Sequence, residues 1–98
     1  MVSPENTDGI EISETFTIIN KLGVHVRPAT QLVKTANTFD SDIYIKKDDL
    51  EVDGKSIMGV LMLAASHGSK IIIRADGKDA KEAIGELGRL IIGKFGEE

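Results

Sequence analysis

Apolar and polar residues alternate in four short segments, which predicts four β-strands. In the first, from about Ser13, Phe16 and Ile18 alternate with Thr15 and Thr17, as in a strand buried on one face. The other three are marked by Ile43 and Ile45, by Leu50 and Val52, and by the β-branched run Ile71–Ile73. The charged turn between the second and third segments predicts a hairpin. The β-branched run is expected to be central in the sheet or covered on both faces.

Three other segments carry apolar residues at the spacing of one helix face. The first begins after His25, and the second is capped by Ser56 and stops near Gly68. In the third, Gly85 and Gly88 are expected to weaken the helix by about 1 kcal/mol each where they are exposed. The buried faces are predicted to consist of Ala29, Leu32, Val33 and Ala36, then Ile57, Val60, Leu61 and Ala64, and finally Ala80, Ile84, Leu87 and Ile91. The order of the elements favours an α+β fold, with an antiparallel sheet and the helices on one face.

The length and composition fit one small domain. A chain of 98 residues has little room for a second core, and its hydrophobic fraction of 41% argues against intrinsic disorder. Residues 1–11 are polar and have no apolar period, so we expect them to form a mobile N-terminal tail. Residues 12–98 are predicted to form the domain.

Charge and cysteine content exclude several classes of function. The net charge of −4 argues against direct nucleic-acid binding, which requires clustered positive charge. The absence of cysteine excludes disulfides and thiolate chemistry. No secretory signal is recognisable, and no segment approaches the ~20 apolar residues of a membrane helix. We therefore expect a cytoplasmic protein without membrane insertion. We also expect a monomer, although composition does not determine the oligomeric state.

The segment from Asn20 to Thr30 places a histidine directly before a helix. The first-turn amides of that helix, chiefly those of Val26 and Arg27, have no intrahelical acceptors and favour an anion. The guanidinium of Arg27 can bind phosphate oxygens, and a neutral imidazole is a nucleophile. His25 therefore combines a nucleophile with a site suited to a phosphoryl group. A lone histidine before a helix is more often a cap or a surface residue, so the residues alone leave both interpretations open.

The run G-V-H-V-R-P-A-T (residues 23–30) resembles the active-site motif of the HPr family, the phosphocarriers of the phosphoenolpyruvate-dependent sugar phosphotransferase system. The resemblance implies that His25 is phosphorylated on Nδ1 by Enzyme I and passes the group to sugar-specific EIIA components, with Arg27 as the adjacent arginine. Val26 departs from the family, which usually has alanine there, and adds bulk beside the imidazole.

The run D-G-K-S-I-M-G-V-L-M-L (residues 53–63) contains the second candidate site. Met58 and Met62 lie off the predicted buried stripe, and exposed methionines suit an adaptable docking surface. The run resembles the regulatory segment of HPr proteins from many Gram-positive bacteria, in which a dedicated kinase phosphorylates the serine. The resemblance makes Ser56 a candidate regulatory site, which serves equally as a helix cap. We expect partners to dock on Lys21, Lys55, Ile57, Met58 and Met62.

The resemblance extends from about Ile12 to Gly93 and implies an open-faced β-sandwich, in which three helices cover one face of a four-stranded antiparallel sheet. The favoured function is a phosphocarrier rather than an enzyme, with Enzyme I, EIIA components and a serine kinase/phosphorylase as partners. No cofactor or metal is indicated, because His25 and His67 are the only histidines and lack metal-ligand spacing. His67 is expected to be structural, near the end of the second helix.

Two other functions of the same resemblance remain open. N-K-L-G before His25 and L-M-L-A-A-S in the second helix are similar to the nitrogen-related branch of the family, whereas K-S-I-M-G-V is similar to the sugar branch. A nitrogen-related carrier would keep His25 and differ in its Enzyme I and acceptors. The other candidate is a co-regulator that binds a transcriptional regulator through phosphorylated Ser56. A generic α+β binding module without phosphoryl chemistry is the least favoured alternative.

Overall fold

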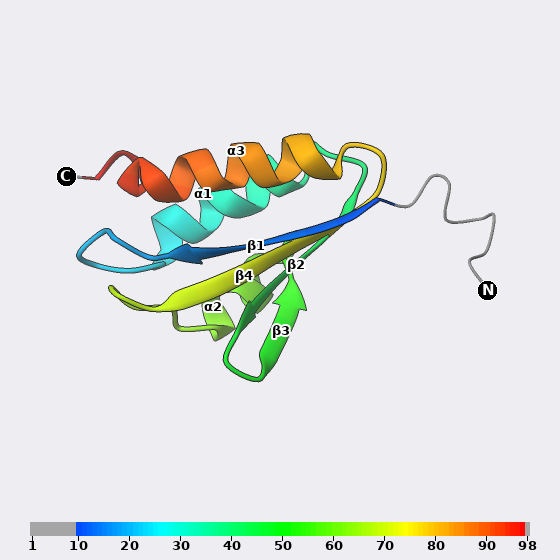
Figure 1. Ribbon diagram of the computed structural model, residues 1–98. Helices are drawn as coiled ribbons and strands as arrows, with labels where there is room; N and C mark the ends of the chain where they lie inside the picture. Colours follow the sequence, from blue (N-terminus) through cyan, green and yellow to red (C-terminus); the bar gives the residue numbers. More distant parts are fainter. Residues whose placement is uncertain (1–9, 98) are drawn as a thin grey trace.

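The computed structural model describes residues 10–97, and its elements follow the predicted order (Figure 1). The strands are β1 (Glu11–Thr17), β2 (Asp42–Lys47), β3 (Leu50–Asp53) and β4 (Lys70–Asp76). The helices are α1 (Val26–Ala36), α2 (Ile57–Met62) and α3 (Ala80–Ile92), followed by the short 3-10 turn η2 (Lys94–Gly96). The predicted sequence of strands and helices is confirmed, and only η2 was not expected.

The four strands form one antiparallel sheet in the order β1-β4-β2-β3. Strand β4 is central, as the β-branched run predicts, and pairs Ile71 with Phe16 and Ile73 with Ile45. Ile71 and Ile73 are buried, but Ile72 between them is 41% exposed. The sheet is therefore covered on one face only, since alternate residues of a strand point to opposite faces.

Helices α1 and α3 lie side by side across the covered face, and the open face is turned away from them (Figure 1). Helix α3 buries the predicted residues Ala80, Ile84, Leu87 and Ile91. Gly88 is buried as well, and a Cβ there would stand 2.7 Å from Cε1 of Phe16. The close packing of α3 on β1 therefore requires glycine at this position. The sequence alone predicts only that Gly88 weakens the helix.

The second helix is shorter than predicted, because backbone hydrogen bonds to other parts of the chain take over after Met62. The amide of Val24 donates to the carbonyl of Ala65 at 2.8 Å, and that of Gly68 donates to Ile18 at 2.7 Å. These bonds pair the segment with the connection between β1 and α1, which is incompatible with further helix. Ala64, predicted to lie on the buried face, is exposed with a φ of 49°.

His67 lies in the turn beyond this shortened helix and is exposed. The prediction that it lies near the end of the second helix, where a cationic side chain suits the helix dipole, is wrong, because the helix ends five residues earlier, at Met62.

The predicted tail of residues 1–11 lies outside the described residues except for Ile10 and Glu11. The carbonyl of Ile10 accepts a hydrogen bond from Gly77 at 2.9 Å, and Glu11 begins β1 opposite Asp76. The folded part therefore starts slightly before the predicted boundary at residue 12. Among the described residues, the helices are too short and too polar to cross a membrane.

Candidate functional site

His25 is the N-cap residue of α1, held there by the loop that precedes it. Its backbone is extended (φ −83°, ψ −165°), and its carbonyl accepts the first helical hydrogen bond from Ala29 at 2.9 Å. Gly23 has a φ of +72°, and a Cβ at this position would lie 2.6 Å from the carbonyl oxygen of Ala65. Only glycine fits such a close approach in this conformation, so Gly23 fixes the path of the chain into His25.

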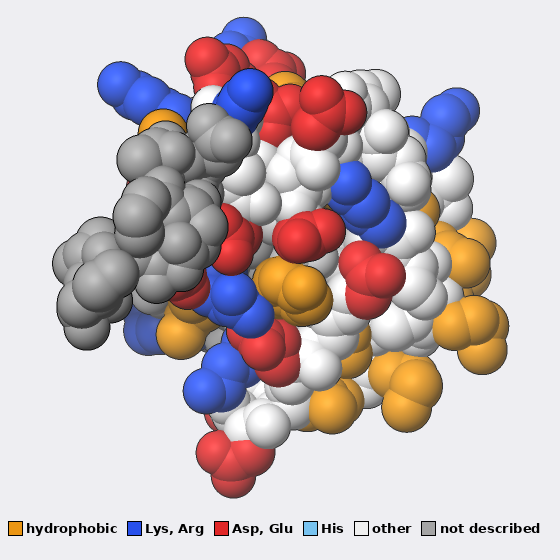
Figure 2. Space-filling view, turned by 90° about the vertical axis from the view of Figure 1, so that its right-hand side faces the viewer, with side chains coloured by type: hydrophobic (Ala, Val, Ile, Leu, Met, Phe, Trp, Pro, Cys, Tyr) orange, Lys and Arg blue, Asp and Glu red, His pale blue; other side chains and the backbone are white. Residues whose placement is uncertain are grey.

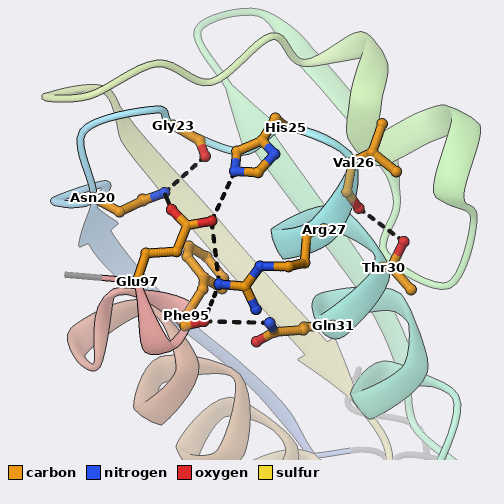
Figure 3. Close-up of polar contacts among 9 residues, drawn as sticks. All are labelled: Asn20, Gly23, His25, Val26, Arg27, Thr30, Gln31, Phe95 and Glu97. Carbon is orange, nitrogen blue, oxygen red and sulfur yellow. Dashed lines mark hydrogen bonds and ion pairs between the residues drawn. The ribbon is translucent and has the colours of Figure 1, made fainter.

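One ring nitrogen of His25 forms a hydrogen bond with a carboxylate near the C-terminal end of the described residues. Its Nε2 lies 2.7 Å from Oε2 of Glu97, and the histidine side chain is 39% exposed (Figure 3). Among the described residues, Nδ1 has no hydrogen-bond partner. Because a carboxylate can only accept, Nε2 carries the proton of this bond and Nδ1 is left with its lone pair when the ring is neutral.

Glu97 is held by two further side chains. Its Oε1 accepts a hydrogen bond from Nδ2 of Asn20 at 2.8 Å, and its Oε2 lies 3.3 Å from the guanidinium of Arg27. The Asn20 bond is the main cause that lowers the pKa of Glu97, followed by the His25 bond and the charges of His25 and Arg27, against partial desolvation. Glu97 is therefore a carboxylate at neutral pH.

Arg27 extends from α1 toward the C-terminal segment. Its guanidinium donates to the carbonyl of Phe95 at 2.9 Å, and Nε2 of Gln31 donates to the same oxygen at 3.3 Å (Figure 3). The Arg27 side chain is 52% exposed. A guanidinium has five N–H groups, so Arg27 keeps donors free for an anion while it holds this segment.

The start of α1 has the features of an anion site. It has no acidic residue in its first turn, and the amides of Val26 and Arg27 have no acceptors within the helix. Val26 is 63% exposed and lies in the first turn of α1, directly after His25 (Figure 3). The extra bulk of valine at this position is thus part of the exposed surface around His25.

Ser56 and Lys55 lie at the other end of α1. Oγ of Ser56 accepts a hydrogen bond from the Gly59 amide at 3.1 Å, which confirms the predicted N-cap of α2. Lys55 donates from Nζ to the carbonyl of Phe39 at 2.8 Å, and its own carbonyl accepts from Asn37 at the C-terminus of α1. His25 caps the N-terminus of the same helix, so the structure does not bring Lys55 or Ser56 together with the imidazole.

The remaining predicted docking residues differ in exposure. Met58 and Met62 are each 66% exposed and Lys21 is exposed, whereas Ile57 is half-buried against the core. Leu22, in the connection between β1 and His25, is 73% exposed and was not predicted as a docking residue.

At the other end of the molecule, where β1 begins, acidic and basic side chains are interspersed and hydrophobic ones gather along one edge of the view (Figure 2).

The comparisons with known proteins agree with this arrangement of sheet, helices and histidine. The family model described as the PTS HPr component phosphorylation site matches residues 12–92. The phosphocarrier protein HPr of Neisseria meningitidis is 45% identical over 86 residues, which cover 88% of this chain and 97% of that protein. That of Cupriavidus necator is 47% identical over 81 residues, which cover 83% of this chain and 91% of that protein.

Solved structures give the same result. The crystal structure of HPr from Thermoanaerobacter tengcongensis has a TM-score of 0.86 and 46% identity, and the match covers 89% of this chain and 98% of that one. The class defined by fold and motif is a phosphocarrier of the phosphotransferase system. Within that class, the chain belongs to the HPr family.

Four residues of the site were not found by sequence reasoning: Asn20, Gln31, Phe95 and Glu97. Glu97 is 72 residues from His25 in the sequence and 77 residues from Asn20, its two hydrogen-bond partners. Asn20 stands at the start of the histidine segment, but nothing in that motif indicates a contact with the C-terminal residues. Glu97 lies outside every motif, since residues 94–97 follow the last predicted helix without an apolar period. The only usable signal was Phe95, an aromatic residue near the end of a chain with few aromatics.

Proposed function

We propose that this protein accepts a phosphoryl group from phosphorylated Enzyme I on Nδ1 of His25 and passes it to an EIIA component. The observation that carries the proposal is the imidazole at the start of α1, bonded through Nε2 to Glu97 and with Nδ1 free of partners in the described chain. Membership of the HPr family supports the same assignment.

In the transfer step, the lone pair of Nδ1 attacks the phosphorus atom of the donor. A new N–P bond forms, and the bond between phosphorus and the leaving atom of the donor breaks, with the electron pair returning to that atom. The developing charge on the phosphoryl oxygens is met by the amides of Val26 and Arg27 and by the Arg27 guanidinium. Transfer to the acceptor is the same step in reverse.

Partners are proposed to dock beside this site. Exposed Met58 and Met62 offer a flexible apolar surface that can adapt to several proteins. Lys21 supplies positive charge for an acidic partner, although the chain as a whole is acidic. Lys55 contributes mainly from the far end of α1, since its ammonium is engaged by Phe39.

The test is transfer of labelled phosphate from phosphoenolpyruvate in the presence of Enzyme I. The wild type should acquire an acid-labile, alkali-stable label, and His25→Ala should abolish it. His67→Ala is the matched control, because it removes the other histidine, which is exposed and away from the site, and should leave labelling unchanged. A label that persists in folded His25→Ala protein would refute the assignment.

The same assay separates the sugar and nitrogen-related branches. With Enzyme I of each type, the proposed sugar carrier should be labelled faster by the sugar-type enzyme. A clear preference for the nitrogen-related enzyme would move the protein to that branch and leave the role of His25 intact.

Regulation through Ser56 is the second proposed function. The chain resembles Crh, the catabolite repression HPr of Bacillus subtilis, at 36% identity over 82% of this chain with a TM-score of 0.62. Ser56 is only partly buried, and Met58 and Met62 lie on the next turns of the exposed side of α2. A phosphate here would add about two negative charges beside the docking surface and disfavour an acidic partner.

This regulatory role is tested by binding of the serine-phosphorylated protein to a transcriptional regulator. Binding should survive His25→Ala and disappear with Ser56→Ala. The opposite pattern would assign the interaction to the histidine.

We further propose that the carrier is cytoplasmic and that it is a monomer. Sedimentation of the purified protein at several concentrations would test the oligomeric state.

A further inference from the structure

The bond between Glu97 and His25 has the geometry of a carboxylate that orients a catalytic imidazole. A carboxylate that accepts from one ring nitrogen fixes the tautomer and the orientation of the ring, and it stabilises positive charge that develops when the other nitrogen reacts. Here the distance is 2.7 Å, and the Glu97 side chain is only 17% exposed, so the bond is partly shielded from water. The reacting nitrogen, Nδ1, lies on the far side of the ring from the carboxylate.

A second layer of contacts holds the carboxylate in place. Asn20 is fully buried, and its Nδ2 donates both to Glu97 at 2.8 Å and to the carbonyl of Gly23 at 2.8 Å. One amide group thus joins Glu97 to the loop that positions His25 (Figure 3). The Oδ1 atom of Asn20 has no hydrogen-bond partner among the described residues. Burial of such an atom is costly, and the orientation of Glu97 by Nδ2 gives a reason for asparagine at this position.

We propose that Glu97 is a positioning residue for phosphoryl transfer, which holds the proton of His25 on Nε2 and stabilises the positive charge of the ring as Nδ1 bonds to phosphorus. This inference rests on the proposed role of His25 as the phosphoryl acceptor.

The Nδ1 lone pair becomes the N–P bond, and the proton of Nε2 stays in the hydrogen bond to Glu97. The ring therefore gains positive charge 2.7 Å from an ionised carboxylate. When the phosphoryl group leaves for the acceptor, the electron pair returns to Nδ1 and the ring is again neutral.

Two other roles for Glu97 are physically reasonable. It contacts the guanidinium of Arg27 at 3.3 Å, so it could instead hold Arg27 away from the phosphoryl group. It could also serve only to fasten the end of the chain through Asn20. The first role predicts faster transfer when Glu97 is removed, and the second predicts a loss of stability without an effect on the imidazole.

The experiment combines nitrogen NMR of histidine-labelled, unphosphorylated protein with the rate of labelling by Enzyme I. At a pH where the ring is neutral, the wild type should have one fixed tautomer with a protected Nε2 proton. In Glu97→Ala the His25 shifts should move toward those of a free, exchanging imidazole, and kcat/KM should fall roughly tenfold, as expected for loss of a hydrogen bond to a charged group.

Two further variants separate the contributions. Glu97→Gln can still accept from Nε2–H but carries no charge, so it should restore much of the tautomer signature and less of the rate. Glu86→Ala is the matched control, because it removes an exposed α3 carboxylate whose one ion pair among residues 10–97 is with Arg89 at 3.1 Å. It should leave both readouts unchanged.

Each of the remaining outcomes would overturn the inference. A Glu97→Ala rate within twofold of the wild type, or above it, would exclude a positioning role. A slower rate with unchanged His25 shifts would assign the effect to Arg27. Failure of the wild type to be labelled would instead refute the proposed acceptor role of His25, and the NMR comparison of the unphosphorylated proteins would distinguish that case.

Discussion

At the scale of single residues, Asp79 connects α3 to the turn before β2. Its carboxylate accepts from the amides of Asp40 at 2.9 Å and Ser41 at 3.0 Å, and also from the Ser41 hydroxyl. The Ser41 hydroxyl bond and then the Asp40 amide lower the pKa of Asp79. The carboxylate therefore turns back to this loop and does not cap its own helix.

This contact predicts a pH-dependent loss of stability in Asp79→Asn. Because the folded pKa of Asp79 is lowered, its contribution is complete above the unfolded value of about 4 and is lost as the pH falls through the folded pKa. Urea unfolding should therefore find the largest difference between wild type and variant at pH 7, and a narrowing difference below about pH 4. Asp48→Asn, at an exposed hairpin position, should give a small difference at every pH.

A difference for Asp79→Asn that stays constant down to pH 2 would mean that the carboxylate charge contributes nothing to the contact.

Residues of the site differ in how well the sequence predicts them. The position of His25 follows from local signals, since a glycine-containing loop and a helix start surround it in the sequence. Glu97 could not be predicted, because its contact with His25 depends on how α3 ends and on where that end lies against α1. Contacts between distant segments also explain why the position of His67 was predicted wrongly. Ala65 and Gly68 form backbone hydrogen bonds with Val24 and Ile18, and these bonds end α2 before His67.

At the scale of elements, α3 carries two glycines in different surroundings. A Cβ at Gly85 would meet nothing within 4 Å, whereas one at Gly88 would lie 2.7 and 2.8 Å from ring atoms of Phe16. The helical period places Gly88, one turn after Ile84, nearer the buried face than Gly85. It does not give the distance between α3 and β1, so the close approach of Gly88 to Phe16 could not be predicted from the sequence.

We predict opposite effects of alanine at the two positions. Gly85→Ala should raise the free energy of unfolding by about 0.5–1 kcal/mol, because alanine favours the helix and restricts the unfolded chain. Gly88→Ala should lower it by about 1–2 kcal/mol, because the buried Phe16 ring must shift. Urea unfolding of both variants is the measurement. Equal stabilisation by both substitutions would mean that Phe16 can move without cost.

At the scale of the whole molecule, the site is assembled from two distant parts of the chain. Lys94 and Phe95 have φ values of 57° and 56°, a left-handed conformation that is strained for residues other than glycine. They turn the chain after α3 so that Phe95 is buried and Glu97 reaches His25. Burial of the Phe95 ring offsets the strain, and the core therefore determines where Glu97 lies.

This linkage predicts that Phe95→Ala lowers both stability and order at the site. Loss of a buried phenylalanine should reduce the free energy of unfolding by about 3–5 kcal/mol. Where the variant remains folded, release of the C-terminal segment should move the His25 nitrogen shifts toward those of a free imidazole. Adding Glu97→Ala should then change the shifts little further, because the effects of coupled residues are not additive.

Ile92→Ala is the control, since Ile92 is 69% exposed at the end of α3. It should leave the free energy of unfolding and the His25 shifts nearly unchanged. Full retention of the wild-type shifts in Phe95→Ala would mean that Asn20 and Arg27 hold Glu97 without the core.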